Sequence, residues 1–181
     1  TIVDGTVFIG SGCHNLACEW YSEGSPPTNG SVFAISTDTG KVKWEYTAGS
    51  EVVSSPAVIS DTVYIGSSDS NLYAIDASNG ELAWRYETND WVWSSPSADD
   101  ERVYVGSWDS GVHAVDRETG RRIWRFPTVG DYVSGSTGID EDSVYIGNTP
   151  ERGKGPTPPG GYRTAEIFAI DKATGEKQWA F

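Results

Sequence analysis

Two cysteines and the histidine between them lie near the start of the chain, and these residue types can bind metals or form disulfides. Cys13 and Cys18 are the two cysteines of the sequence, four residues separate them, and His14 lies between. Thiolates and imidazoles bind zinc, but a structural zinc site takes four ligands, and no second ligand pair follows elsewhere. Cysteines this close also form local disulfides in an oxidising compartment. The segment predicts a disulfide, with free thiols and a metal site as the alternatives.

A second group of residues sets carboxylates beside aromatic rings at matching places in the sequence. The candidates are Asp90, Trp91, Trp108, Asp131 and Tyr132, and Trp93 follows closely on Trp91. Aromatic faces can stack a flat ligand and attract a cation that a carboxylate also holds. We predict a ligand-binding face from these residues. The alternative is that the tryptophans pack between structural elements and the aspartates make turn hydrogen bonds.

Motifs of familiar catalytic sites are missing. The sequence contains no Gly-rich phosphate loop, no His-Glu-x-x-His stretch and no Gly-x-Ser-x-Gly elbow. His113, the second of two histidines, aligns with Tyr73 and is expected to be half-buried structure. We therefore assign no catalytic residue and no metal site, and we lean towards a protein that is not an enzyme.

A repeat must position all of these residues. Four segments share an Ala-(Ile/Val)-(Ser/Asp) start, a glycine and a tryptophan, and each follows a Val-aromatic-(Ile/Val)-Gly signature. The tryptophans are 40, 40 and 55 residues apart, which is typical of the blades of a β-propeller. The marker tryptophans are Trp44, Trp84, Trp124 and Trp179.

The second copy of the repeat can be divided into four strands, A to D. β-branched and aromatic residues fill the predicted strands at 54–59, 63–67, 72–76 and 82–87, and Gly, Asn, Asp and Ser fill the turns. The loops between strands C and D end in glycines, where a hairpin needs a positive φ. The marker tryptophan of strand D is expected to pack on the neighbouring blade, so its role is structural.

The Val-Tyr-Ile-Gly…Leu-Tyr-Ala-Ile-Asp…Asn-Gly…Trp pattern of residues 63–84 resembles the repeat of the pyrroloquinoline-quinone (PQQ) enzyme family. The same repeat occurs in quinoprotein alcohol dehydrogenases, in BamB-like lipoproteins that bind proteins, and in sensor regions of some prokaryotic kinases. The resemblance implies an all-β propeller in which these four four-stranded antiparallel blades are half of a seven- or eight-bladed ring. A closed four-bladed ring and a dimer that completes eight blades are the alternatives.

The expected blades cover approximately residues 1–47, 48–88, 89–128 and 129–181, as a single propeller region. Blade 1 starts inside its strand A, and Phe181 follows the last tryptophan closely, so the sequence is expected to be a fragment whose partner is the rest of the ring. Quinoprotein alcohol dehydrogenases often carry a disulfide between adjacent cysteines. Cys13 and Cys18 are not adjacent, so the resemblance does not extend to that feature.

Two blades carry insertions at the same place in the repeat. From the glycine of strand B to the alanine of strand C the chain takes 8 residues in blades 2 and 3, 24 in blade 1 and 22 in blade 4. The B–C loops share one face of a blade with the connectors from strand D to the next strand A. Insertions that gather on one face of a repeat protein often mark its binding face, although neutral drift in tolerant loops is the alternative.

Composition excludes several classes of partner. The net charge of −13 repels phosphate backbones and anionic lipids, so no nucleic acid is expected, and no apolar run is long enough for a membrane span. The scattered acidic residues suggest the surface of a protein from a halophilic prokaryote, and a cation-binding surface is the alternative. The cysteine pair suggests an extracytoplasmic location, secreted or at the cell surface.

The sequence therefore favours a non-catalytic scaffold that binds a protein or an extracytoplasmic ligand on its B–C and D–A face, with no cofactor assigned. One alternative is part of a PQQ-dependent alcohol or sugar dehydrogenase, which would hold PQQ with calcium. Another is the sensor portion of a larger receptor or kinase.

Overall fold

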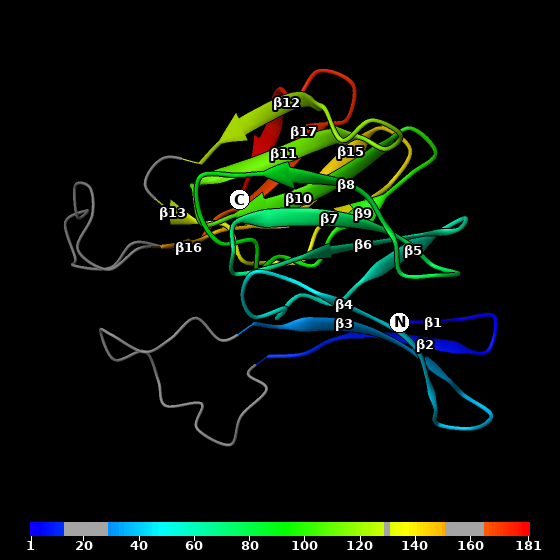
Figure 1. The fold of residues 1–181 in the computed structure, drawn as a ribbon. Helices are drawn as coiled ribbons and strands as arrows, with labels where there is room; N and C mark the ends of the chain where they lie inside the picture. Colours follow the sequence, from blue (N-terminus) through cyan, green and yellow to red (C-terminus); the bar gives the residue numbers. More distant parts are fainter. Residues whose placement is uncertain (13–28, 129–130, 151–164) are drawn as a thin grey trace, which may run out of the picture.

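A computed structural model describes residues 1–12, 29–128, 131–150 and 165–181. In these residues the chain forms four antiparallel four-stranded sheets, each ordered as a meander, which confirms the predicted all-β fold (Figure 1). Blade 1 contains β1 (Ile2–Val3), β2 (Thr6–Gly10), β3 (Ser31–Ser36) and β4 (Val42–Thr47), and blade 2 contains β5 (Ala57–Ile59), β6 (Thr62–Gly66), β7 (Asn71–Asp76) and β8 (Leu82–Glu87). Blade 3 contains β9 (Ser97–Ala98), β10 (Arg102–Ser107), β11 (Gly111–Asp116) and β12 (Arg122–Pro127), and blade 4 contains β14 (Gly138–Ile139), β15 (Ser143–Gly147), β17 (Ile167–Asp171) and β18 (Lys177–Ala180).

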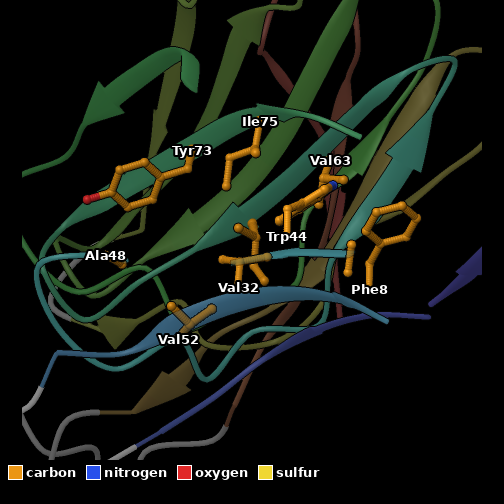
Figure 2. Packing of buried hydrophobic residues seen from close by; sticks show 10 residues of the cluster. Phe8, Val32, Trp44, Ala48, Val52, Val63, Tyr73 and Ile75 are labelled. Carbon is orange, nitrogen blue, oxygen red and sulfur yellow. The ribbon is translucent and has the colours of Figure 1, made fainter. Parts of the chain in front are cut away.

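The hydrophobic core lies between successive blades. Figure 2 shows the first of these layers, in which Phe8 and Trp44 of blade 1 face Val63 and Ile75 of blade 2. Two further clusters of the same kind join blade 2 to blade 3 and blade 3 to blade 4. Because the buried apolar side chains lie in these layers between neighbouring sheets, each blade depends on its neighbours for stability.

The marker tryptophans build these layers. The indole Nε1 of Trp44 donates to the backbone oxygen of Ala77 in the next blade at 2.8 Å, and the ring lies over Gly80, where an added Cβ would stand 2.8 Å from Cδ2. Trp84 repeats both contacts with Arg117 and Gly120, and Trp124 repeats them with Lys172 and Gly175. These three glycines have φ between +69° and +79°. Glycine at this position therefore allows the positive φ of the hairpin and also leaves room for the neighbouring indole.

A small residue opposite each indole completes the pattern. Trp44 pairs with Ala34 across β3 and β4, and the register shifts directly after this alanine. The same alanine–tryptophan pair and the same shift recur in the other three blades. Such a bulge re-aims a side chain, so the recurring alanine and the bulge together direct each indole towards the next blade.

The two end blades do not close on each other. The side chain of Trp179 in β18 is 47% exposed, whereas Trp44 and Trp124 are 8% exposed. Gly40 of blade 1, the counterpart of Gly80, has no atom within 4 Å of an added Cβ. The four blades therefore form an open arc, and the closed four-bladed ring is wrong for this chain.

Both insertions fall largely outside the described residues. Cys13, His14 and Cys18 lie there, so the disulfide remains a prediction. The second insertion starts with β16 (Thr149–Pro150), which pairs antiparallel with β13 (Asp131–Tyr132) in the connector from blade 3 to blade 4. The connector and the inserted B–C loop thus meet on the same side of the blades.

Candidate functional site

The connector face, meaning the side that carries the B–C turns and the D–A connectors, is held together by backbone hydrogen bonds. In the connector between blades 2 and 3, Val92 N donates to Ser67 O at 3.0 Å in blade 2. Trp91 O accepts from Trp108 N at 2.9 Å in blade 3. Each connector residue is thereby fixed to a B–C turn, so side chains from the two segments are brought together although their sequence positions differ.

Four aromatic rings meet on this face. Trp108 lies at the centre, with its ring centroid 4.9 Å from that of Trp91, 4.5 Å from that of Trp93 and 4.3 Å from that of Tyr132. The rings of Trp91 and Trp93 stack at 5.0 Å. All four side chains are half-buried, so the cluster is packed against itself and still presents ring surface to solvent. We call these four residues the aromatic cluster.

The cluster extends across three blades. Trp93 Nε1 donates to Ser68 Oγ in the B–C turn of blade 2 at 2.8 Å, and Tyr132 belongs to the connector that leads to blade 4. Trp108 Nε1 is buried and has no hydrogen-bond partner in the described part of the chain. The central indole is therefore held by its ring contacts with Trp91, Trp93 and Tyr132.

Of the two predicted carboxylates, the structure describes the side chain of Asp90 alone. Asp90 Oδ1 accepts from the backbone nitrogen of Trp91 at 2.8 Å, so this carboxylate orders the connector. Asp131 pairs with Pro150 in the β13–β16 ladder through its backbone, and its side chain lies outside the described set. No cluster of three metal-ligating side chains occurs in the described residues.

The aromatic cluster is a departure from the repeat. At the positions of Trp91, Trp93 and Trp108, blade 2 has Glu51, Val53 and Ser68. The backbone bond from Ser68 N to Glu51 O, at 2.8 Å, matches the one from Trp108 N to Trp91 O, so the two connectors share one geometry. The fold does not require aromatic residues at these positions, because blade 2 has the same connector geometry without them.

A buried ionic network lies directly after Trp108. Asp109 Oδ1 is 3.1 Å from Nε2 of His113 and 3.4 Å from Nη2 of Arg125, and Tyr86 of blade 2 contacts Nδ1 of His113 at 2.9 Å. Because a carboxylate only accepts, Nε2 of His113 carries the hydrogen. Oδ2 of Asp109 also accepts from the backbone nitrogen of Asn89 at 3.3 Å. The side chain of Asp109 is 3% exposed, and His113 is fully buried rather than half-buried as expected.

This network predicts a stability difference that depends on pH. Burial by itself raises the pKa of Asp109, but the hydrogen bond and charge of His113 and the charge of Arg125 outweigh it and lower the pKa to about 2. An aspartate in an unfolded chain has a pKa of about 3.9, so the carboxylate stabilises the fold above that pH and loses this contribution as the pH falls towards 2.

Asp109→Asn is therefore expected to lower the free energy of unfolding at pH 7 by about 1–2 kcal/mol, after allowance for solvent screening of the shift. The difference from the parent chain should shrink between pH 4 and pH 2, as measured by urea denaturation at each pH. Asp100→Asn is the control, since Asp100 is fully exposed and its nearest cation, Arg117, is 3.9 Å away. A pH-independent difference at Asp109 would assign the loss to packing.

Sequence comparison decides the family of these blades. A family model described as outer membrane protein assembly factor BamB matches residues 2–90 and 28–181, which together span almost the whole chain. The chain belongs to this BamB-type family of PQQ-like repeats. No curated protein matches the sequence. Family membership agrees with the resemblance that the Val-Tyr-Ile-Gly and Trp pattern indicated.

Solved structures place the BamB-type arc within larger propellers. A europium-containing methanol dehydrogenase matches with a TM-score of 0.75 over 99% of this chain and 40% of its own, at 19% identity. BamB from Moraxella catarrhalis matches with a TM-score of 0.58 over 83% of this chain and 55% of its own, at 17% identity. Quinohemoprotein alcohol dehydrogenase from Comamonas testosteroni matches with a TM-score of 0.60 over 72% of this chain and 21% of its own, at 27% identity.

The four blades thus span between 21% and 55% of the length of these three proteins. They correspond to part of a propeller, as the sequence predicted. In the ranges that the structure covers, no helix is long and apolar enough to cross a membrane.

Proposed function

We propose that this BamB-type chain is part of a non-catalytic scaffold that binds a protein partner through the aromatic cluster on its connector face. The observation that carries the proposal is the replacement of Glu51, Val53 and Ser68 of blade 2 by three tryptophans at the same backbone positions of blade 3. Partly exposed Trp and Tyr side chains supply large contact areas at little cost in conformational entropy, and such residues are enriched in binding hot spots.

The surroundings of the cluster indicate the chemistry of the partner. The chain has a net charge of −13, and the connectors bring Glu51 and Asp90 close to the rings. A partner segment that presents Arg or Lys beside apolar side chains would find ring faces for its cations and carboxylates near by. An extracytoplasmic location, and a high-salt habitat for so acidic a chain, are parts of the same proposal.

Trp91→Ala and Trp108→Ala are each expected to weaken binding of a purified partner by about 30-fold or more, because each removes a hot-spot ring. The partner is first identified by crosslinking in the source cells, and its affinity is then measured by calorimetry with the parent chain. Ile123→Ala is the matched control, since Ile123 is 42% exposed and lies in β12, on the outer edge of the same blade. Unchanged affinity in both tryptophan variants would remove the site from this face.

A PQQ-dependent dehydrogenase is the second candidate, favoured by the 27% identity to a quinohemoprotein alcohol dehydrogenase. The rings that could stack on a flat quinone already stack on each other with centroids 4.3 and 5.0 Å apart, which leaves no gap for a further ring between them. Titration of the chain with PQQ and Ca²⁺, followed by tryptophan fluorescence, separates the two candidates: saturable quenching at micromolar PQQ would favour the dehydrogenase.

A further inference from the structure

An asparagine followed by glycine occurs at two places in the chain, Asn29-Gly30 and Asn79-Gly80. This dipeptide is prone to spontaneous deamidation, because glycine has no side chain to shield the backbone nitrogen that attacks the amide. Both asparagines are exposed. Asn79 lies in the C–D loop of blade 2, where the other three blades have threonine: Thr39, Thr119 and Thr174. The fold therefore does not require asparagine at this position.

The side chain of Asn79 is folded back over the peptide bond that follows it. Its Oδ1 accepts from the backbone nitrogen of Glu81 at 2.8 Å, which closes the ring of an Asx turn. Such a ring holds Cγ of the asparagine next to the backbone nitrogen of Gly80, the atom that attacks Cγ in deamidation. The Glu81 N–H also donates to the oxygen that gains negative charge during the attack, and a donor in that place stabilises the transition state.

One hydrogen bond opposes the reaction. The backbone nitrogen of Gly80 donates to the backbone oxygen of Asp76 at 2.9 Å, and this bond must open before the nitrogen can attack. Ser78 and Asn79 are exposed, and hydrogen bonds in exposed turns open far more often than those in the core. The opposing bond thus slows the reaction without preventing it.

The other asparagine–glycine pair lacks the Asx ring. The backbone nitrogen of Ser31, which would close the same ring at Asn29, donates to Ser11 Oγ at 3.1 Å. Because the two pairs have the same covalent structure, a difference between their rates in the folded chain reports the effect of the fold.

We propose that Asn79 is a deamidation site of the folded chain. The backbone nitrogen of Gly80 forms a bond to Cγ of Asn79 and gives up its proton. The bond from Cγ to the side-chain nitrogen breaks, and ammonia leaves with that proton. Water then opens the succinimide ring that results. Opening at the side-chain carbonyl gives aspartate, and opening at the main-chain carbonyl gives isoaspartate, so water is the only other reactant.

The isoaspartate product would disturb the contact between blades 1 and 2. Isoaspartate adds one carbon atom to the main chain directly before Gly80, and Gly80 lies against the indole of Trp44. The oxygen of Ala77, which accepts from Trp44 Nε1 at 2.8 Å, belongs to the same loop. The aspartate product keeps the length of the main chain and an oxygen that can accept from the nitrogen of Glu81. Isoaspartate alone should therefore displace the surface on which Trp44 packs.

This inference is independent of the proposed function, because the C–D loops lie on the face opposite the aromatic cluster. Incubation of the folded chain in mildly alkaline buffer, followed by peptide mapping with mass spectrometry, tests it. Asn79 should deamidate about tenfold or more faster than Asn29. In urea the two rates should become alike, since neither side chain is then held. A rate at Asn29 in the folded chain that equals or exceeds the rate at Asn79 would overturn the proposal.

Asn79→Thr is the matched control for the incubation. Thr119 Oγ1 in blade 3 accepts from the backbone nitrogen two residues on, at 3.4 Å, as Asn79 Oδ1 does in blade 2. The threonine variant should therefore keep the loop and form no deamidated product at this position.

Urea denaturation of the separated products tests the effect on the blade contact. Ion-exchange chromatography resolves the aspartate and isoaspartate forms from the parent chain. The isoaspartate form should unfold at a lower urea midpoint than the parent chain. Asn79→Asp, which has the main chain of the other product, should keep the midpoint of the parent. An isoaspartate form with an unchanged midpoint would contradict the predicted displacement at Trp44.

Discussion

Replacing Trp124 by alanine is expected to lower the free energy of unfolding by about 3–5 kcal/mol, which is the usual cost of removing a buried tryptophan. The indole is 8% exposed, lies over Gly175 of blade 4, and donates from Nε1 to Lys172 O at 2.9 Å. The substitution opens a cavity between blades 3 and 4 and also leaves that carbonyl without its donor. Chemical denaturation followed by circular dichroism measures the loss.

Trp179→Ala is the matched control for this prediction. Trp179 holds the same position in its blade, opposite Ala169, but no blade lies over it. At a concentration at which the chain is monomeric, its loss should cost about 1 kcal/mol or less. Equal losses for Trp124 and Trp179 would mean that the indole stabilises its own sheet, and would contradict a core that lies between blades.

The sequence predicts most of the fold because each blade is coded locally. The strand predicted at 82–87 is β8, and the glycines at the ends of the C–D loops have the expected positive φ. The innermost strand is shorter than the predicted 54–59, since β5 covers only Ala57–Ile59. Ser54 Oγ accepts from the backbone nitrogen of Gly66 at 2.8 Å and donates to its backbone oxygen at 3.0 Å. A side chain thus replaces the backbone hydrogen bonds of the ladder at that point. Strand propensity alone does not reveal that a side chain makes these hydrogen bonds.

The candidate site is predicted less completely, because its residues meet only through the arrangement of blades. Alignment of the repeats singled out Trp91, Trp108 and Tyr132, since these positions differ between copies. It could not show that Trp93 would stack on Trp91 or that Asp90 would bond its own connector. The pairing of Asp109 with His113 was predictable from the repeat, because blade 2 has Asp69 and Tyr73 at the same spacing. There the Tyr73 hydroxyl donates to Asp69 at 2.5 Å.

Gly120→Ala is expected to lower the free energy of unfolding by about 2–5 kcal/mol. Gly120 has a φ of +69°, where a side chain costs about 1–2 kcal/mol. The new Cβ would also stand 2.8 Å from Cδ2 of Trp84 and 2.9 Å from Cε3, so the indole or the loop must shift at a further cost of about 1–3 kcal/mol. Urea denaturation of the monomeric chain measures the sum.

Gly40→Ala separates the two contributions. Gly40 has a φ of +65° and open space above it, so its substitution should cost only the conformational part, about 1–2 kcal/mol. Introducing Gly120→Ala into a chain that already carries Trp84→Ala should cost the same as Gly40→Ala, because the ring that the new methyl group meets is gone. A full additional loss in that double variant would place the strain inside the hairpin, whereas a loss reduced to the Gly40 value assigns it to the contact between blades.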